Sequence, residues 1–256
     1  MILLLPAWIA LALVMVAAWA HQRRAGNGGW ADVYWSLGLG ACGVALTLAG
    51  GDGPRSWLVA AAIGLWSARL GGYILLRTRR GPEDTRYAQF RQEWGAAFQT
   101  RMFWFLQIQA LAALVLVLPV LLAARSPRPF GWPDAVAIAI LLLAVMGEAL
   151  ADHQMHAFRR DPANRGKVCD TGLWGWSRHP NYVCEVAHWL AYPLFAIGGE
   201  WSWLAWIGPV FMYWLIVHVS GIPPLEAQML RSRGEAYRAY QRRVPAFLPF
   251  PKRTGP

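Results

Sequence analysis

Residues 102–124 read MFWFLQIQALAALVLVLPVLLAA, a run without a single charged side chain. A helix needs about 20 apolar residues to cross the hydrocarbon core of a bilayer. Six other stretches approach this length and character, and we expect spans near residues 2–20, 32–50, 57–76, 133–152, 182–199 and 201–220. The sequence therefore predicts an all-α polytopic membrane protein with seven transmembrane helices, built by residues 1–256 as a single integral membrane domain.

The composition of the chain supports this class. Hydrophobic residues make up 56% of the sequence, charged residues make up 15%, and the mean hydropathy is +0.30. Soluble domains carry about 25% charged residues, so the low charge favours a membrane protein, and the high hydrophobic fraction excludes a disordered chain. The three cysteines lack CxxC spacing and the six histidines are scattered, so we expect neither a disulfide scaffold nor a metal site.

The basic residues predict the orientation. Segments 21–31, 77–101, 153–181 and 224–256 hold 20 of the 24 lysines and arginines. Because cytoplasmic loops of membrane proteins are enriched in basic residues, we expect an external amino terminus and a cytoplasmic tail over 224–256. The net charge of +10 therefore reflects membrane topology, and we expect no nucleic-acid partner. The predicted location is a membrane, the bacterial inner membrane, with the active site open to the cytoplasm.

Ionisable side chains inside the spans need a partner or a function, because the bilayer disfavours charge. They lie mostly toward the predicted cytoplasmic ends: Asp32 with Tyr34, Arg69, Glu148 with Asp152, Glu185 with His188, and His218. Structural ion pairs, for example between Arg69 and Asp32, would explain each residue singly. A polar cavity open to the cytoplasm would explain the whole group, and we favour that interpretation.

A second cluster follows the fifth span. Glu148, Asp152 and Arg159 recur at helical spacings, so they share one face of a helix that continues past the membrane. Residues 161–167, DPANRGK, should end that helix through their proline and glycine. Residues 171–182, TGLWGWSRHPNY, follow, and Pro180 should open the sixth span. A helix amino terminus beside Arg178 is well suited to a phosphate.

Two further segments have competing interpretations. Gly38, Gly40 and Gly43 match the letters of the dinucleotide-binding fingerprint but lie inside a predicted membrane helix, where close helix packing explains them better. The tail from residue 221 to 245 has an apolar stripe beside basic positions. This stripe is typical of a short interfacial helix that anchors to the membrane surface, and the sharper alternative is that the tail pairs with residues 178–182.

Residues 177–182, SRHPNY, with Glu185, then PPLE at 223–226 and residues 237–245, resemble the bacterial DUF1295 membrane proteins, which are relatives of steroid 5α-reductases. The resemblance covers nearly the whole chain. The Arg-His-Pro-x-Tyr element is also similar to that of sterol C14/C7 reductases and of isoprenylcysteine carboxyl methyltransferases.

The resemblance to the reductases implies a seven-helix enzyme with NADPH in a cytoplasmic-facing cavity. It places Asp152 with Arg159, and Asn181 with Glu185, at cofactor-binding positions. The family's substrate-polarising Glu and Tyr correspond to Asp32 and Trp66, two departures that Tyr34 or Tyr73 could offset with a hydroxyl. The full set of expected cofactor-binding residues is Glu148, Asp152, Arg159, Arg160, Asn164, Lys167, Trp176, Arg178, His179, Asn181, Tyr182, Glu185, Glu226, Tyr237 and Tyr240.

The leading hypothesis is an NADPH-dependent reductase of a carbon–carbon double bond conjugated to a ketone, in a lipophilic substrate such as a 3-oxo-4-ene steroid. Asp32, Tyr34 and Trp66 are its catalytic candidates. Asp32 would be protonated if it faces the substrate, or ionised and structural if it pairs with Arg69. The alternatives are an S-adenosylmethionine-dependent methyltransferase using His179, Tyr182 and Glu226, and a non-enzymatic sterol or lipid binder. We expect membrane lipid and the small-molecule substrate as partners, without an obligate protein partner.

Overall fold

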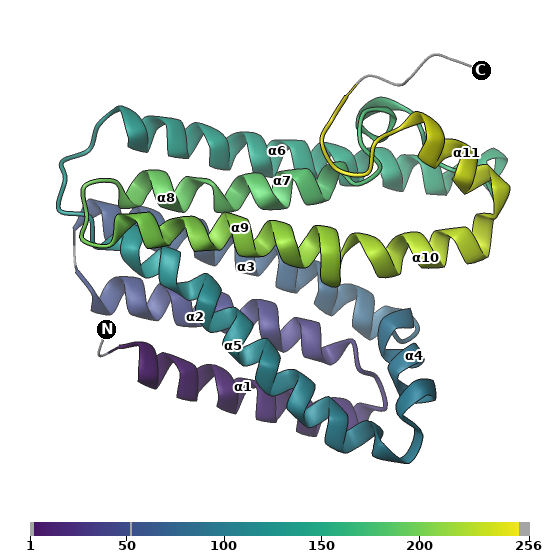
Figure 1. Ribbon diagram of the computed structural model, residues 1–256, viewed down its shortest axis with the longest axis horizontal. Coiled ribbons are helices and arrows are strands. Elements are labelled where there is room, and N and C mark those ends of the chain that lie inside the picture. The colour runs from purple at the N-terminus through teal and green to yellow at the C-terminus, as the bar shows by residue number, and fades with distance from the viewer. Residues whose placement is uncertain (1–2, 52, 251–256) are drawn as a thin grey trace. The chain divides into compact units, whose positions relative to one another are not determined.

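The computed structural model describes residues 3–51 and 53–250, and within these ranges the chain forms helices and no strand (Figure 1). The chain divides into two compact units. The first comprises Met1–Phe130 and Tyr192–Gly208, and the second comprises Gly131–Ala191 and Pro209–Pro256. The all-helical class is confirmed for the described residues, whereas the single membrane domain stays a prediction.

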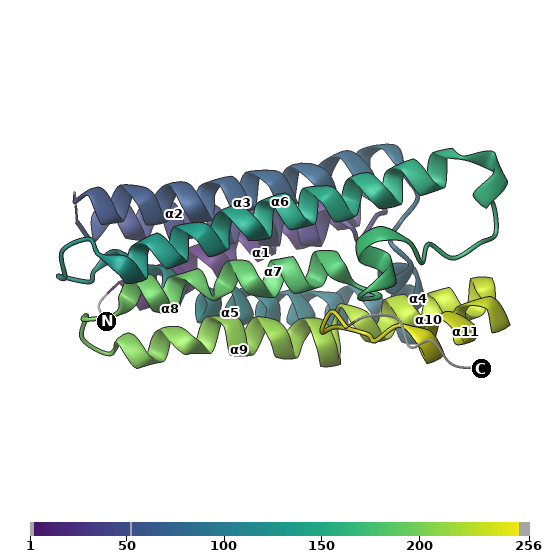
Figure 2. The same cartoon turned by 90° about the horizontal axis from the view of Figure 1, so that it is seen from above.

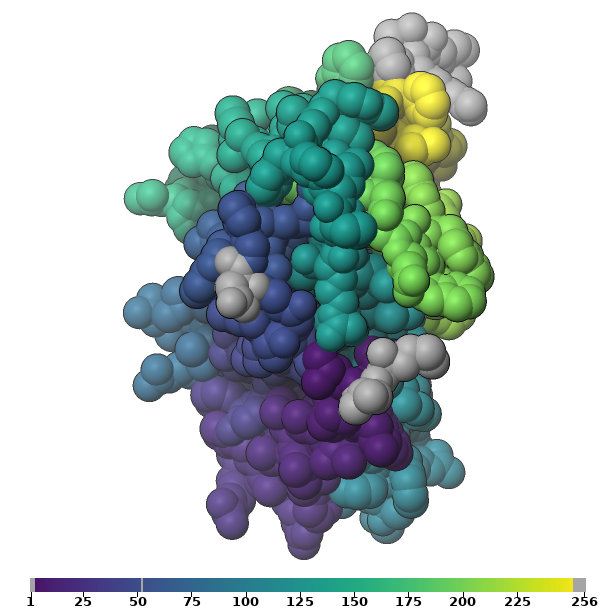
Figure 3. All heavy atoms as spheres, turned by 90° about the vertical axis from the view of Figure 1, so that its left-hand side faces the viewer, coloured from purple at the N-terminus to yellow at the C-terminus, as the bar shows by residue number. Residues whose placement is uncertain are grey.

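The first unit is a bundle of long helices. They are α1 (Leu4–Ala25), α2 (Trp30–Ala49), α3 (Pro54–Arg80) and α5 (Phe98–Ala124), with the shorter α4 (Thr85–Trp94) and the single turn η1 (Gly95–Ala97) between the last two. Most of α8 (Ala191–Ala196) and the turn η4 (Ser202–Trp206) also belong to it. Helix α2 packs along α3, and α1 packs along α5, whose blue-green spheres touch the purple spheres of α1 in Figure 3.

The second unit begins with α6 (Trp132–Arg160), the longest helix, followed by the turns η2 (Pro162–Asn164) and η3 (Gly172–Gly175). Helix α7 (Pro180–Trp189) runs beside α6 in both views of Figures 1 and 2. The unit ends with most of α9 (Ile207–Trp214), the π-helical turn η5 (Leu215–Val219), α10 (Ile222–Arg233) and α11 (Glu235–Arg243).

Among the residues that the structure describes, six helical stretches are long and apolar enough to cross a membrane, which identifies an integral membrane protein. They are Leu4–Ala25, Trp30–Ala49, Pro54–Arg80, Thr85–Ala124, Trp132–Arg160 and Ser202–Arg233. The span expected at 182–199 falls on two shorter helices, α7 and α8, that meet at Leu190. The count of seven spans therefore stays a prediction.

Helix α4 is an addition to the expected loop at 77–101. It starts at Asp84, whose carboxylate accepts a hydrogen bond from the backbone N–H of Arg86 at 3.1 Å and so caps the helix. Its aromatic face is formed by Phe90 and Trp94, whose rings stack with centroids 4.6 Å apart. Because α4 is short and highly charged, no apolar run in the sequence indicates it.

The glycines of α2 serve close packing, as expected. A Cβ added to Gly40 would lie 2.1 Å from the Ser67 side chain of α3, and one added to Gly38 would lie 2.8 Å from Val14 of α1. Ser67 donates a hydrogen bond to the carbonyl of Ser36 at 2.8 Å across the same contact. The motif therefore lets neighbouring helices approach and is no part of a nucleotide-binding loop.

Candidate functional site: a cationic pocket in the second unit

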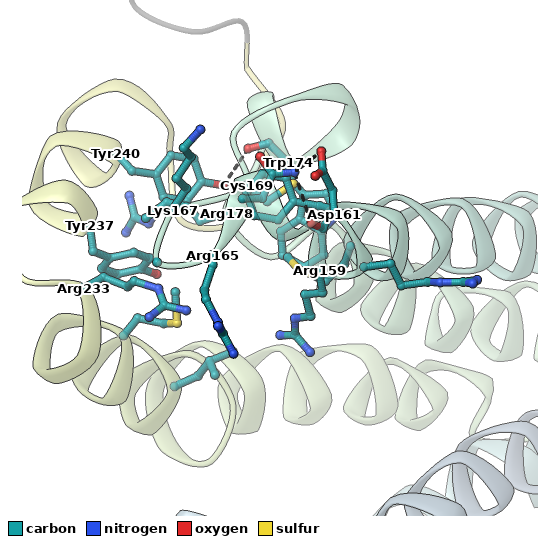
Figure 4. Close-up of a pocket in the computed structure, with 18 of the residues that line it drawn as sticks. Arg159, Asp161, Arg165, Lys167, Cys169, Trp174, Arg178, Arg233, Tyr237 and Tyr240 are labelled. Carbon is teal, nitrogen blue, oxygen red and sulfur yellow. Dashed lines mark hydrogen bonds between the residues drawn. The ribbon is translucent and has the colours of Figure 1, made fainter.

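A pocket of about 600 Å³ lies wholly within the second unit. Figure 4 shows Tyr237 and Tyr240 on one side of it and Arg159 with Asp161 on the other, with Arg165 between them. Its walls come from the end of α6, the segment that follows, and helices α10 and α11. The lining includes five cations and an aromatic ring, namely Arg159, Arg165, Lys167, Arg178, Arg233 and Tyr237.

The turn after α6 places cations around the pocket. Helix α6 ends at Arg160, and Asp161 then begins η2, because its carboxylate accepts the N–H of Ala163 at 2.9 Å. Gly166 follows with φ +83°, a left-handed conformation that glycine adopts readily. The reversal brings Arg165 and Lys167 to the same pocket as Arg159.

The charge of the lining is strongly positive. Five cations of the lining, Arg159, Arg160, Arg165, Lys167 and Arg233, form no ion pair with another described residue. Asp161 is the sole acid among the lining residues. Apolar and aromatic surface from side chains such as Met229, Leu225 and Trp174 completes the wall. Such a site suits a ligand that carries both phosphate groups and flat rings.

Arg178 is held in place rather than left to bind a ligand. Its Nε lies 2.7 Å from Oε1 of Glu226, and the two side chains are only 10% and 15% exposed. The same oxygen lies 3.1 Å from Nε2 of His179, and Gln241 donates to the other carboxylate oxygen at 2.8 Å. Glu226 thus joins α10 and α11 to the residues that precede α7.

The contacts of Glu226 with Arg178, His179 and Gln241, here called the Glu226 clamp, are extended by contacts to the backbone. The N–H of Arg178 donates to the carbonyl of Pro245 at 2.9 Å, and its guanidinium donates to the carbonyls of Gln241 and Val244. The hydroxyl of Tyr240 donates to the carbonyl of Trp174 at 2.6 Å. Burial raises the pKa of Tyr240 well above its usual value, so the phenol stays protonated. The expected pairing of the tail with residues 178–182 is confirmed.

Eight of the expected cofactor-binding residues line the pocket: Arg159, Arg160, Asn164, Lys167, Arg178, His179, Tyr237 and Tyr240. Glu226 contacts two of them. Glu148 and Asp152 lie further back on α6, and Asn181, Tyr182 and Glu185 lie on α7, outside the lining. Trp176 is 53% exposed and also lies outside it. Their roles stay predictions.

Arg165, Arg233 and Cys169 also line the pocket, although none of them was expected there. Arg165 lies in segment 161–167, and its positive charge beside Lys167 was the sequence feature that could have predicted its place in the pocket. Arg233 comes from α10, a helix distant in sequence, and no local pattern marks it. Burial raises the pKa of the Cys169 thiol, so this cysteine is a weak nucleophile at neutral pH.

Among the catalytic candidates, Asp32 is tied into a network in the first unit. Its carboxylate accepts hydrogen bonds from Nη2 of Arg86 at 2.6 Å and from the hydroxyl of Tyr87 at 2.7 Å. The contact with Arg86 is an ion pair, and the side chain of Asp32 is 17% exposed. Of the two roles considered for Asp32, the structural one fits these contacts, with Arg86 in place of Arg69 as the paired cation.

The other two catalytic candidates lie elsewhere in that unit. The hydroxyl of Tyr34 is 3.0 Å from Nδ1 of His21 on α1. Trp66 is 4% exposed within the bundle. Neither Tyr34 nor Trp66 lines the cationic pocket, and Asp32 does not line it either. Their catalytic roles stay predictions.

Comparison with known proteins adds a family and two relatives. An uncharacterized protein of Schizosaccharomyces pombe, C594.04c, is 31% identical over 72% of this chain and 60% of its own length. The Delta(14)-sterol reductase TM7SF2 of Mus musculus is 30% identical over 46% of this chain and 31% of its own length. The chain thus spans less than two thirds of either relative, and no solved structure matches it.

Residues 18–244 match the family described as DUF1295, protein of unknown function. The chain therefore belongs to the DUF1295 family, and part of it is similar to a sterol reductase.

Proposed function

We propose that this protein is a membrane reductase that binds NADPH in the cationic pocket and reduces a carbon–carbon double bond conjugated to a ketone in a lipophilic substrate. The observation that carries the proposal is the pocket itself, whose lining combines apolar and aromatic side chains with five cations that form no ion pair with another described residue. The similarity to a sterol reductase supports the reaction class.

The lining fits NADPH in charge and size. A volume of about 600 Å³ falls within the range of small-molecule sites. Arg159, Arg165 and Lys167 would meet the phosphates, and Arg233 faces the pocket from α10, where it would reach a further phosphate. The ring of Tyr237 offers a flat surface for stacking.

The protein's own part would be binding and orientation. When bound, the cofactor supplies the hydride, and few protein groups need to react. Glu226 holds Arg178 and His179 so that α10 and α11 close one side of the site. On the substrate side Asp32, Tyr34 and Trp66 stay candidates, with the contacts of Asp32 to Arg86 and Tyr87 favouring a structural role for that carboxylate.

The charge of the pocket weighs against the methyltransferase alternative. S-adenosylmethionine carries a sulfonium and no phosphate, so a ring of arginines and lysine would have only its carboxylate to bind. His179 and Glu226, which that alternative assigns to the cofactor, are occupied by each other and by Arg178. NADPH therefore fits the pocket better.

The test is ligand binding by the purified full-length protein in detergent. We expect NADPH to bind the wild type, and Arg159→Gln and Arg165→Gln each to weaken it about tenfold, the value of one lost charged hydrogen bond. Arg231→Gln is the matched control, because Arg231 lies on exposed α10 surface outside the pocket. Binding of S-adenosylmethionine in place of NADPH, or equal loss in all three variants, would refute the proposal.

A further inference from the structure

A second hollow lies in the first unit, between the end of α1 and the start of α2. It is a shallow groove of about 570 Å³, lined by Ala17, Ala20, His21, Arg24, Ala25 and Tyr34. The five residues from α1 recur at spacings of three, four, seven and eight, so they form one face of that helix. This face combines small apolar side chains with a cation and an imidazole.

The polar end of the groove is pre-arranged. Nδ1 of His21 lies 3.0 Å from the hydroxyl of Tyr34. The imidazole also stacks on the indole of Trp30, with ring centroids 4.1 Å apart and planes 21° from parallel. These two contacts fix the ring and occupy Nδ1, which leaves Nε2 as the nitrogen that a ligand would meet.

The groove carries the positive charge of Arg24, and no acidic residue of its lining neutralises that charge. Arg24 is exposed in the last turn of α1, and within the described part of the chain it has no ion pair. No acid is among the residues of the groove. The neighbouring Arg23 is engaged differently, with its guanidinium 5.4 Å from the ring centre of Trp19.

The position of the groove indicates what kind of ligand it meets. Arg23 and Arg24 end a helix that is long and apolar enough to cross a membrane, so the groove lies where lipid headgroups are found. Toward the apolar part of α1 the groove has the methyl groups of Ala17 and Ala20, and Leu13, one turn earlier, is 63% exposed. A ligand with a negative head and a hydrocarbon tail would match both ends.

We propose that this groove binds an anionic phospholipid of the surrounding membrane. The phosphate would pair with Arg24, His21 and Tyr34 would hydrogen-bond the headgroup, and one acyl chain would lie over Ala17 and Ala20. The site is separate from the cationic pocket and requires no nucleotide, so it can hold whether or not the proposed reductase function does.

The test is native mass spectrometry of the full-length protein in detergent, titrated with phosphatidylglycerol and with phosphatidylcholine of the same acyl chains. We expect tighter binding of phosphatidylglycerol, and about tenfold weaker binding in Arg24→Gln, as for one lost charged hydrogen bond. Arg23→Gln is the matched control, because it removes the same charge from the same turn outside the groove. It should bind phosphatidylglycerol as the wild type does.

A second pair of variants tests the groove without changing charge. Ala17→Phe fills it and should weaken phosphatidylglycerol binding, whereas Ala10→Phe, two turns earlier on exposed surface of α1, should not. Equal effects of Arg23→Gln and Arg24→Gln would show diffuse attraction to basic surface and overturn the proposal. So would unchanged binding in Ala17→Phe, equal affinity for the two lipids, or inorganic phosphate that displaces the lipid fully at low concentration.

Discussion

Oε1 of Glu226 lies 2.7 Å from Nε of Arg178 and also contacts the ring of His179, although 47 or more residues separate the carboxylate from both in sequence. One side chain on α10 therefore orders the segment that leads into α7. Because Arg178 also donates to carbonyls of α11 and of the residue after it, the clamp connects three parts of the pocket wall.

The first prediction is that Glu226→Ala loosens this clamp. The variant leaves the guanidinium of Arg178, 10% exposed, without its carboxylate, which should lower the free energy of unfolding by about 1–3 kcal/mol. NADPH binding should weaken with it, because the wall carrying Tyr237 is no longer fixed. Thermal unfolding and NADPH titration in detergent measure both effects.

Glu235→Ala is the control for that variant. Glu235 pairs with Arg242 and Arg238 on α11, but these side chains are more than 60% exposed, so the loss of stability should be much smaller than in Glu226→Ala. A Glu226→Ala protein as stable as Glu235→Ala, with unchanged NADPH affinity, would show that the clamp does not order the pocket.

The second prediction concerns the carboxylate of Asp32. Asp32→Leu and Arg86→Gln break the same 2.6 Å ion pair, and we expect each to lower the free energy of unfolding by about 1–3 kcal/mol. Enone reduction per folded molecule should fall to a similar extent in both. If Asp32→Leu alone abolishes reduction while Arg86→Gln keeps it, Asp32 is the polarising acid and its structural role is secondary.

The third prediction is a pH dependence of stability from Asp84. Burial opposes ionisation of this carboxylate, but hydrogen bonds and charge from Arg86 and Arg77 outweigh burial and lower its pKa. A lowered pKa in the folded state contributes stability above the ordinary aspartate pKa of about 4, and that stability is lost as the pH falls through the folded value. The melting temperature of the wild type should therefore fall on acidification below about pH 4.

In Asp84→Asn the melting temperature should fall less steeply on acidification, because the asparagine side chain does not titrate. We call this acidic part of the stability curve the acid limb. Glu200→Gln removes an exposed carboxylate of the same unit and should leave the limb unchanged. Identical acid limbs in the wild type and Asp84→Asn would mean that the ion pairs at the start of α4 contribute nothing measurable.

The fourth prediction tests the close approach of α2 and α3. Gly40→Ala places a methyl group against Ser67 and should lower the free energy of unfolding by about 1–3 kcal/mol through overpacking. Gly72→Ala, on α3, meets nothing within 4 Å and should be neutral or stabilising, since alanine favours a helix. The free energy of unfolding of both variants, measured by denaturation in the same detergent, shows whether close packing or helix propensity governs the effect of an added methyl group.

The fifth prediction is the orientation of the chain. Segments 21–31, 77–101, 153–181 and 224–256 hold 20 of the 24 basic residues, which predicts a cytoplasmic carboxyl terminus. A phosphatase reporter fused after residue 250 should be inactive in bacterial cells, and a fluorescent protein at the same point should be bright. An active phosphatase would reverse the predicted topology and move the proposed NADPH site to the other side of the membrane.

Local signals in the sequence predicted much of this architecture. Pro180 does begin α7, and the proline and glycine after Arg160 do end α6, because both residue types act on the backbone within one turn. Apolar runs located the six candidate spans for the same reason. These features depend on near neighbours alone.

Contacts between distant segments escaped prediction. Arg86 reaches Asp32 across 54 residues, and Arg233 joins the pocket from α10. Nothing in the local pattern around Arg86 distinguishes it from the other arginines of segment 77–101, since its partner is chosen by the packing of α4. The eight pocket residues that were anticipated came from segments already marked by clustered charge.

The clamp at Glu226 also sets an order of events during synthesis. Arg159, Arg165 and Lys167 leave the ribosome before α10 and α11 have been synthesised. Until then, one wall of the pocket around these three residues is missing. The pocket closes when Glu226 reaches Arg178 and the carbonyl of Pro245 reaches its backbone N–H. Assembly of the site is therefore one of the last steps in making this protein, after its apolar helices have been synthesised.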